Sequence, residues 1–514
     1  MALAKALSAA VHGIDAYVVE VEVDVGRGLA GQFPIVGLPD SSVQEARERV
    51  RAAIRNTGLM FPDRRIIVNL APADVRKEGP GLDLPIAAGL LAASGQVEMA
   101  GLCDTVLVGE LALDGSVRPI SGVLPVAIGV RAAGIRRLVV PASNAPEAAV
   151  VSGVEVYPVS SLAEVVALLN DGVGAEPFAG ASPLDDLCAP TFDVCFSDVK
   201  GQDHAKRALE VAAAGSHNLL MVGPPGSGKT MLARRLPTIL PPLTLDEALE
   251  VTKIYSISGH LPPETSLITA RPFRAPHHTI SYAGLVGGGS VPRPGEVSLA
   301  HHGLLFLDEL TEFRRDILEM LRQPLEDGVI TIARIAGSIA YPARVMFVGA
   351  ANPCPCGHLG DTARGCTCNP YNVQKYRQRL SGPLLDRIDI QIEVPRLKQE
   401  EMVSRGGTGP TSAQVRERVR AARDIQAGRF AGLGLFTNAQ MASKHLRQFC
   451  AVDDATQSLL RAAIQQLGLS ARAYDRVLKL ARTIADLEAV ESIAPAHVAE
   501  ALQYRSLDRK LWQA

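Results

Sequence analysis

The chain has 514 residues, of which 47% are hydrophobic and 21% charged, and a globular chain of this length divides into roughly three domains. Its formal net charge of −2 excludes a global attraction to nucleic acid or anionic membranes, so any polyanion must bind to a local basic patch. Eight cysteines, four of them between residues 354 and 368, argue against a disulfide framework and indicate a reducing compartment, which we expect to be the cytoplasm.

The N-terminal sequence MALAKALSAAVHGIDAYVV combines one lysine with small apolar residues. Polar and acidic residues interrupt it before a signal-peptide pattern is complete, so we predict a β-strand there. Nowhere does the chain reach about eighteen uninterrupted apolar residues, the length that a membrane-spanning helix requires. We therefore expect no membrane partner.

Residues 1–170 alternate short apolar strands with amphipathic helices, which predicts a separate α/β domain. The segment 171–193 is rich in Gly, Ala and Pro without periodicity, which indicates a linker. The expected strands lie at 16–25, 65–70, 106–113 and 137–141, and the expected helices at 42–57, 124–133 and 162–169.

Three motifs of this first domain carry a resemblance to a known family: KEGPG at 77–81, GEL with DGSVRPI between 109 and 120, and AGI to VVP between 133 and 141. The domain resembles the proteolytic domain of Lon proteases, in which a serine nucleophile follows Gly-Pro and a lysine base lies on a later helix. Those places fall here on Gly81 and Leu124. Because neither residue can attack or activate, the resemblance implies a Lon-like fold without protease activity, which assists ring assembly or binds DNA.

Residues 194–397 contain a phosphate-binding loop after the apolar run from Leu219 to Val222. Its pattern is G-x-x-x-x-G-K-[ST], whose glycines let backbone N–H groups point at phosphate oxygens. We expect Lys229 to reach the β- and γ-phosphates of ATP and Thr230 to bind Mg²⁺. A Gly/Pro turn that merely contains a lysine is the structural alternative. The loop is Gly223-Pro224-Pro225-Gly226-Ser227-Gly228-Lys229-Thr230.

A second apolar strand, GLLFLDE at 303–309, ends in two carboxylates. This is the Walker B arrangement, in which we expect Asp308 to hold the Mg²⁺ shell and Glu309 to orient and polarise the attacking water. A strand that ends in surface acids is the simpler alternative, but the phosphate loop upstream favours the catalytic interpretation.

Three further positions resemble catalytic residues of AAA+ ATPases, which have a P-loop core of parallel strands and flanking helices. Asn352 follows a buried strand and resembles sensor 1, Arg387 in LLDRID resembles an arginine finger, and Arg472 in SARA resembles sensor 2. A finger presented to the neighbouring subunit's γ-phosphate would stabilise charge that develops during transfer. Each residue alone has a structural explanation, and their order behind the two Walker motifs makes the set persuasive. Residues 196–202 resemble the AAA+ entry box, although a loop before a helix explains them nearly as well.

Two insertions interrupt the core. Residues 271–298 are Gly-rich and basic, and residues 326–341 alternate around a central glycine, which predicts a β-hairpin before sensor 1. The candidate DNA contacts on these insertions are Arg274, Arg293 and Arg334. The paired histidines His277-His278 and His301-His302 could bind metal, but packing or phosphate contacts explain them more simply.

The stretches PFRAPHHT, GEVSLAHHG, LEDG and ANPCPCG together resemble the magnesium-chelatase-like AAA+ proteins, and specifically the ComM/YifB family, over nearly the whole chain. The resemblance implies a hexameric, ATP-dependent helicase that promotes branch migration on single-stranded or branched DNA during natural transformation. It implies no small-molecule substrate other than ATP. A magnesium-chelatase-type remodelling ATPase that acts on a protein partner is the alternative, and Gly81 and Leu124 disfavour a protease or unfoldase.

Two C-x-C pairs lie between sensor 1 and the finger. Four thiolates with Gly and Pro neighbours suit tetrahedral Zn²⁺. Because C-x-C is rarer than C-x₂-C, reduced structural thiols, or His358 in place of one cysteine, remain alternatives. The four candidate ligands are Cys354, Cys356, Cys366 and Cys368.

A polar stretch at 398–411 leads into a predicted helical lid at 411–514. Helical apolar spacing covers 414–429, 452–468, 471–487 and 495–504. The first of these helices carries four arginines that could touch DNA, although a solvated helix face explains them better.

Overall fold

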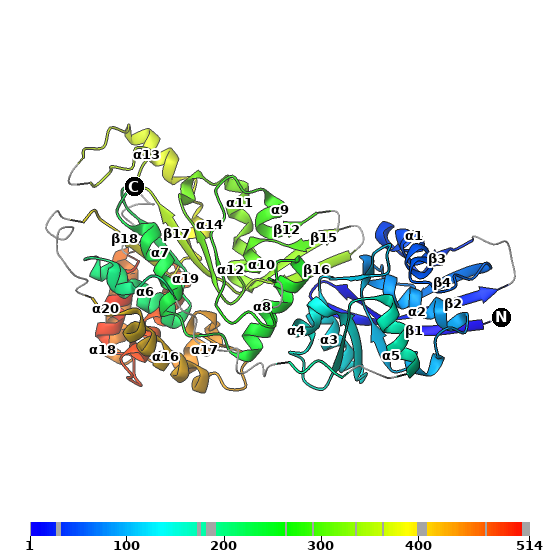
Figure 1. Ribbon diagram of the computed structural model, residues 1–514. Coiled ribbons are helices and arrows are strands. Elements are labelled where there is room, and N and C mark those ends of the chain that lie inside the picture. The colour runs from blue at the N-terminus through cyan, green and yellow to red at the C-terminus, as the bar shows by residue number, and fades with distance from the viewer. Residues whose placement is uncertain are drawn as a thin grey trace. The chain divides into compact units, whose positions relative to one another are not determined.

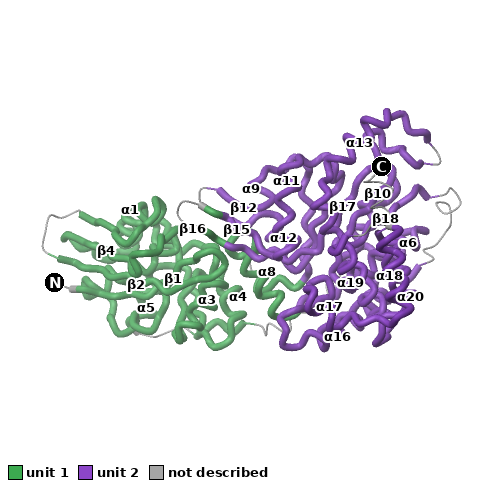
Figure 2. The backbone as a smooth tube through the Cα atoms, turned by 180° about the vertical axis from the view of Figure 1, so that it is seen from behind, with its two compact units in different colours: residues 1–188, 244–269, 333–339 green, residues 189–243, 270–332, 340–514 purple. Residues whose placement is uncertain are grey.

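A computed structural model of the chain describes residues 2–26, 32–171, 176–180, 192–262, 265–289, 292–334, 337–361, 364–397, 409–467 and 470–505. The chain divides into two compact units, each assembled from separate stretches (Figure 2). Unit 1 comprises residues 1–188, 244–269 and 333–339, and unit 2 comprises residues 189–243, 270–332 and 340–514. Most of the predicted linker at 171–193, most of the polar stretch at 398–411 and the end of the predicted lid at 506–514 lie outside the described residues.

A seven-stranded mixed sheet forms the centre of unit 1, in the order β3-β4-β2-β1-β5-β8-β9. β1 and β2 pair antiparallel along their whole length, whereas β5, β8 and β9 run parallel. Buried and less buried side chains alternate along β4, because the sheet has one face on the core. The strands are β1 (Ala2–His12), β2 (Asp15–Gly26), β3 (Ile35–Val36), β4 (Arg65–Ala71), β5 (Thr105–Leu107), β8 (Arg137–Pro141) and β9 (Glu155–Val159).

The helices of unit 1 pack on this sheet. α2 (Asp83–Ala93) is apolar nearly all round, and it is buried at every residue against β1 and β2. The strand predicted at 106–113 is two strands, which residues 108–109 separate, and a side chain at Gly109 would meet Val117 at 2.9 Å. The other elements are α1 (Ser41–Asn56), α3 (Val123–Ala132), α4 (Ala145–Ala148), α5 (Leu162–Asp171), β6 (Glu110–Leu111) and β7 (Val117–Arg118).

Unit 1 also contains a helix that follows the phosphate loop in the sequence. This helix, α8 (Leu245–Ser258), packs against α3. The Ser256 hydroxyl of α8 donates a hydrogen bond to the carboxylate of Glu147, which also accepts the N–H of Leu124 at 2.8 Å. Burial raises the pKa of Glu147, although these donors oppose the shift. α8 therefore supplies a hydrogen-bond donor to a buried carboxyl group of the N-terminal domain.

Unit 2 is built on a five-stranded parallel sheet in the order β11-β14-β17-β10-β18, with flanking helices (Figure 1). The three central strands are buried at every residue, which explains their unbroken apolar sequences. The strands are β10 (Leu219–Val222), β11 (Phe273–Arg274), β14 (Leu304–Leu307), β17 (Met346–Ala351) and β18 (Ile390–Glu393). The helices are α6 (Asp203–Gly215), α7 (Lys229–Ile239), α11 (Arg315–Met320), α12 (Arg322–Asp327), α13 (Pro370–Arg377) and α14 (Gly382–Leu385). The parallel α/β core confirms the predicted fold class.

Both insertions contain regular structure. In the first, Gly287 has φ of +105°, and a side chain there would meet the carbonyl oxygen of Arg293 at 2.5 Å, so the β12–β13 ladder requires glycine. The second insertion is a two-stranded hairpin, as predicted. The elements are α9 (Tyr282–Val286), β12 (Gly287–Gly288), β13 (Arg293–Pro294) and α10 (Glu296–Leu299), then β15 (Val329–Arg334) and β16 (Gly337–Pro342).

The C-terminal region is helical, as predicted. It contains α16 (Ser412–Arg429), α17 (Ser443–Phe449), α18 (Asp454–Leu467), α19 (Ala471–Leu487) and α20 (Pro495–Gln503). The prediction of a solvated arginine face was wrong for Arg416 and Arg423 of α16, which are half-buried and bind acceptors on α7 and α6, whereas Arg418 binds an acceptor on α6 but stays 45% exposed at its side chain. Arg416 donates to the Thr238 carbonyl at 2.9 Å, Arg418 to the Glu210 carboxylate at 2.5 Å and Arg423 to the Ala213 carbonyl at 2.8 Å. Within the described residues, no helix has both the length and the apolar character that crossing a bilayer would need.

Candidate nucleotide-binding site

The parallel sheet of unit 2 brings three predicted motifs to one edge. The phosphate loop follows β10, the Asp308-Glu309 pair follows β14, and Asn352 follows β17, which lies between the other two strands. Because the carboxyl ends of parallel strands lie at the same edge of a sheet, the side chains meet there. One pocket is lined by residues 225–231, Asp308, Glu309, residues 350–351 and Asn352.

The backbone of the phosphate loop takes conformations that favour glycine. Gly226 has φ of +76° and Gly228 has φ of +94°, and Gly228 immediately precedes α7. At Gly223 a side chain would meet the carbonyl oxygen of Val394 at 2.1 Å, so the strand can pass β18 closely only without one. The loop therefore leads into a helix N-terminus whose N–H groups suit phosphate oxygens.

Lys229 is the first residue of α7, and it is buried. Its ammonium group donates to the carbonyl oxygens of Gly223 at 2.7 Å and Pro224 at 3.0 Å, and to the side-chain oxygen of Asn352 at 3.3 Å. Burial lowers the pKa of Lys229 to about 8, while the charges of Asp308 and Glu309 act in the opposite direction. A bound triphosphate would supply the negative charge that favours the ammonium form.

Thr230 and Asp308 lie together at the predicted magnesium position. The Thr230 hydroxyl donates to Oδ2 of Asp308 at 2.6 Å. Hard hydroxyl and carboxylate oxygens in this arrangement fit Mg²⁺, which binds a few protein oxygens and keeps several waters or phosphate oxygens. Asp308 Oδ1 accepts the N–H of Glu309 at 2.9 Å, which fixes the backbone at Glu309, the candidate for orienting the attacking water.

The candidate arginine finger and sensor 2 lie apart from the lining of this pocket but close to one another. Arg387 and Arg472 both contact the carboxylate of Glu326, which lies near the end of α12. Arg472 is 3.7 Å from Glu326 and is 62% exposed at its side chain, whereas Arg387 is largely buried. Burial lowers the pKa of Arg387, and the nearby charges of Arg322 and Arg472 add to the effect. We call Arg387 and Arg472 the arginine pair, and Glu326 is their shared partner.

The three candidate DNA contacts have different surroundings. Arg274 donates to both carboxylate oxygens of Glu296, at 2.6 and 2.7 Å, so it braces the start of the first insertion against its end. Arg293 is exposed on β13. Arg334 is the last residue of β15, and its side chain lies outside the described part of the chain.

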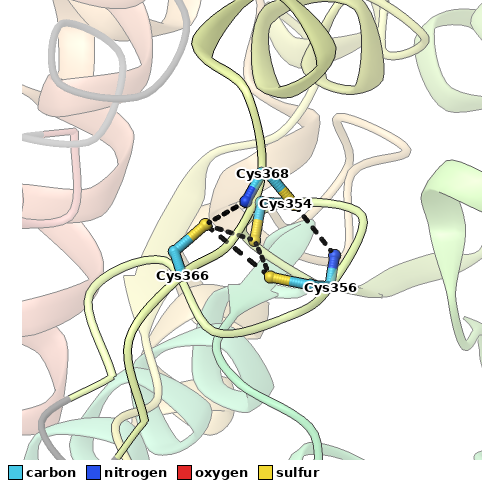
Figure 3. Close-up of side chains that lie close together, drawn as sticks. All are labelled: Cys354, Cys356, Cys366 and Cys368. Carbon is cyan, nitrogen blue, oxygen red and sulfur yellow. Dashed lines mark hydrogen bonds between the residues drawn. The ribbon is translucent and has the colours of Figure 1, made fainter.

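The four candidate zinc ligands converge in one cluster (Figure 3). Sγ of Cys354 is 3.4 Å from Sγ of Cys356 and 3.6 Å from Sγ of Cys366. Cys368 Sγ accepts the N–H of Cys356 at 3.4 Å. In a tetrahedral site with Zn–S bonds of about 2.3 Å, the sulfur atoms lie about 3.8 Å apart, so the cluster fits zinc.

Backbone donors prepare one of these thiols for a metal. The N–H groups of His358 and Thr367 lower the pKa of the Cys356 thiol to about 5, whereas burial raises that of Cys354. His358 pairs with Asp361, at 3.3 Å between Nδ1 and Oδ2. The sulfur cluster therefore forms without a ligand from His358.

Gly81 and Leu124, the two residues that the sequence places at the expected Lon nucleophile and base, lie in short-range helical structure of unit 1. Gly81 lies in a short 3-10 turn, and its carbonyl accepts the N–H of Gly109 at 3.0 Å. Leu124 is completely buried in the first turn of α3. Both positions support packing.

Comparisons with known proteins agree with this architecture. Three family models match the chain: "Magnesium chelatase, subunit ChlI" at residues 195–402, "Subunit ChlI of Mg-chelatase" at 21–144 and "Magnesium chelatase, subunit ChlI C-terminal" at 409–505. Competence protein ComM of Haemophilus influenzae is 46% identical over 517 residues, which cover 99% of each chain. Uncharacterized protein YifB of Salmonella typhimurium is 43% identical over 99% of this chain and 98% of its own. Lon protease 2 of Bacillus subtilis is 30% identical over 29% of this chain and 27% of its own.

The fold and the pocket define a magnesium-chelatase-like AAA+ protein, a class that implies ATP and Mg²⁺ as ligands. Within that class, the chain belongs to the ComM/YifB family, because its identity to both relatives extends over nearly its full length. The predicted resemblance is confirmed. The family membership indicates ATPase activity.

Proposed function

We propose that this protein is an ATP-driven DNA helicase that works as a homo-hexamer in the cytoplasm and promotes branch migration when incoming DNA is integrated during natural transformation. The ATPase part of the proposal is carried by the pocket that combines Lys229, Thr230, Asp308, Glu309 and Asn352. The DNA part is supported by the full-length identity to a protein named for competence.

The proposed reaction is an in-line transfer of the γ-phosphoryl group of ATP to water. Glu309 orients and polarises the attacking water, and the bond between the γ-phosphorus and the bridging oxygen breaks as the new P–O bond forms. Lys229 stabilises charge on the β- and γ-phosphate oxygens, and the Asn352 amide holds either the γ-phosphate or the water. Mg²⁺ bound at Thr230 and Asp308 would neutralise further phosphate charge.

A neighbouring subunit would complete the site. Head-to-tail contacts close into a ring when the rotation between subunits permits, and such a ring presents one subunit's arginines to the next subunit's nucleotide. The geometry supports this because Arg387 and Arg472 gather at one place outside their own pocket, where Glu326 holds them. A γ-phosphate carries more charge than one carboxylate and could replace Glu326 as the partner of both guanidiniums.

The DNA contacts would come from the insertions. Arg293 is the best supported candidate, because it is exposed on a short ladder within an insertion whose start and end are joined by the Arg274–Glu296 pair. Arg334 on the hairpin remains a second candidate, whereas Arg274 would act on DNA only indirectly, by holding the insertion. A few such residues per subunit, repeated around a ring, would give a near-neutral chain a basic channel.

We also propose that Cys354, Cys356, Cys366 and Cys368 hold a structural Zn²⁺ ion. The cluster directly follows Asn352 and precedes α13 and α14, which lead to Arg387. A metal at this place would fix the chain between the sensor and the finger.

The helicase proposal is tested by ATP turnover and strand separation. Purified protein should hydrolyse ATP faster with single-stranded or branched DNA, and it should convert a four-way junction to duplex products with ATP. The Lys229→Ala variant is the negative control. Arg293→Ala should weaken DNA binding and reduce the slope of log K against log salt by about one. A wild-type protein that neither responds to DNA nor resolves a junction would refute the helicase proposal.

A magnesium-chelatase-type remodelling ATPase is the second candidate. It is favoured by the three family models, all of which bear the name of a magnesium chelatase subunit. This candidate predicts nucleotide-dependent ring assembly and ATP turnover that no form of DNA changes. The turnover comparison with and without DNA therefore separates the two.

A further inference from the structure

A histidine of the first insertion lies beside the candidate catalytic glutamate. Nδ1 of His278 is 3.7 Å from Oε2 of Glu309. The imidazole also packs against the ring of His277, with centroids 4.0 Å apart, and meets the ring of Phe313 edge to face at 6.3 Å. Because a ring packed on two sides has few rotamers available, the nitrogen that faces Glu309 is held in place.

The sheet explains why these two residues meet although they are far apart in the sequence. β11 pairs in parallel with β14, with Phe273 opposite Leu304, so the chain that follows each strand leaves the sheet at the same edge. His278 follows β11 and Glu309 follows β14. The Arg274–Glu296 ion pair fixes the start of the insertion, so His278 approaches the glutamate from a braced segment.

Glu309 combines an unusual backbone conformation with a largely exposed side chain. Its φ of +49° lies in the left-handed region, which residues other than glycine rarely adopt and which is often retained at functional sites. Its side chain, however, is 56% exposed. A general base works only when its oxygen lies within hydrogen-bond reach of the water it polarises, so a mobile carboxylate needs a neighbour that orients it.

The separation of 3.7 Å exceeds a hydrogen bond, but a small rotation of the glutamate would close it. Catalytic hydrogen bonds are often long in a protein without substrate and tighten when the substrate binds. Glu309 also lines the nucleotide pocket. The carboxylate can therefore contact His278 and remain directed at the pocket.

We propose that His278 is a positioning residue for Glu309: an N–H at Nδ1 donates to the glutamate and holds its carboxylate toward the attacking water. Because His278 belongs to the insertion that carries Arg293, a ligand on that insertion would change the orientation of the catalytic carboxylate. The inference rests on the ATP hydrolysis proposed above and does not require DNA to be the ligand.

The test compares full-length variants in the absence of DNA. His278→Ala removes the donor, whereas His278→Asn places a side-chain NH₂ group near the position of Nδ1. We expect His278→Ala to lower kcat about tenfold, with KM for ATP and the Kd of a fluorescent ATP analogue changed by less than about twofold. His278→Asn should recover most of kcat. His277→Ala is the comparison variant, since it removes one packing partner of the His278 ring but leaves the nitrogen that faces Glu309, so its kcat should fall by no more than about threefold.

A double-mutant cycle identifies the residue through which His278 acts. In a Glu309→Gln background, His278→Ala should change the remaining turnover by less than about twofold, because the group it positions is already altered. Unchanged kcat in His278→Ala, equal loss in the Ala and Asn variants, loss of analogue binding, or full additivity in the cycle would each overturn the inference.

Failure of the proposed function is distinguishable from failure of this inference. A wild-type protein that hydrolyses ATP but moves no DNA refutes the helicase proposal and leaves the role of His278 to be decided by its own variants. A wild-type protein without turnover refutes the ATPase proposal, and the positioning role falls with it.

Discussion

The nucleotide pocket and the arginine pair lie in the same unit, but they treat positive charge in opposite ways. In the pocket, Lys229 donates to two backbone carbonyls and one amide, and burial lowers its pKa to about 8. In the arginine pair, Arg387 and Arg472 share a carboxylate. The pocket is prepared to receive an anion, whereas the pair already holds one. A nucleotide phosphate can therefore bind to the pocket without displacing another anion. At Arg387 and Arg472 it must first displace the carboxylate of Glu326.

The largest effect should follow from removing the pocket's own cation. Lys229→Ala should reduce turnover about 1,000-fold, because the ammonium stabilises charge that develops on the phosphates. Phosphate release measures this loss. Glu309→Gln should lose turnover to a similar extent yet still retain ATP in a filter-binding assay, since it keeps the phosphate loop. Substantial turnover in both variants would refute the site.

The second largest loss of turnover should follow from a substitution in the arginine pair. Part of the activity should return when two inactive variants are mixed. Arg387→Ala should lower turnover about 100-fold, as expected when one preorganised donor to the transferring group is lost. Mixing it with Lys229→Ala should restore part of the activity, because some pockets with Lys229 then meet a neighbour with Arg387.

The double variant Lys229→Ala/Arg387→Ala, mixed with either single variant, is the control for that experiment. It can supply neither half of a site, so no activity should return. Equal recovery with the double variant would contradict action between subunits.

A smaller loss of turnover should follow from disturbing the cysteine cluster, which lies between Asn352 and Arg387 in the chain. Cys366→Ser should remove most bound zinc, as measured by metal analysis, and should lower turnover by about threefold because Asn352 and Arg387 lie on either side of the cluster in the chain. Cys103→Ser, which changes an exposed cysteine of unit 1, should leave zinc content and turnover unchanged. Absence of zinc from the wild-type protein would contradict the prediction.

The smallest effect should appear in stability. Glu326→Gln removes the carboxylate shared by the two arginines and should lower the Tm of the nucleotide-free protein by about 2 °C, since Arg387 is only 8% exposed and loses its counter-charge. An ATP analogue that drives assembly should reduce the difference. Glu319→Gln, which changes the partner of Arg322, is the matched control. A decrease in Tm that persists unchanged in the assembled protein would argue against anion exchange.

The residues of the pocket could be predicted because they follow strands whose sequences show that they are buried and parallel. Once β10, β14 and β17 share a sheet, Lys229, Asp308 and Asn352 must meet at its edge. The four cysteines could be predicted for a similar reason, since short spacing limits how far they can separate. Local pattern and sheet geometry sufficed for both sites.

Contacts that depend on the course of an insertion or on side-chain conformation could not be predicted. The paired histidines were recognised, but no pattern connects His278 with Glu309, because the contact depends on the course of an insertion. The pairing of Arg274 with Glu296 and the convergence of Arg387 and Arg472 on Glu326 likewise depend on side-chain conformations. A single sequence records the charges of these residues but not their partners.

The position of α8 also bears on how the protein can be divided or recombined. The N-terminal module is not a continuous piece of sequence, because it includes a helix encoded after the phosphate loop. A fragment cut at residue 170 would lack the Ser256 hydroxyl and leave the buried Glu147 short of a donor. A fragment with the ATPase portion alone would contain α8 but not α3, the helix against which α8 packs. Chimeras should therefore exchange residues 1–170, 244–269 and 333–339 together, so that all three stretches of the unit come from the same parent.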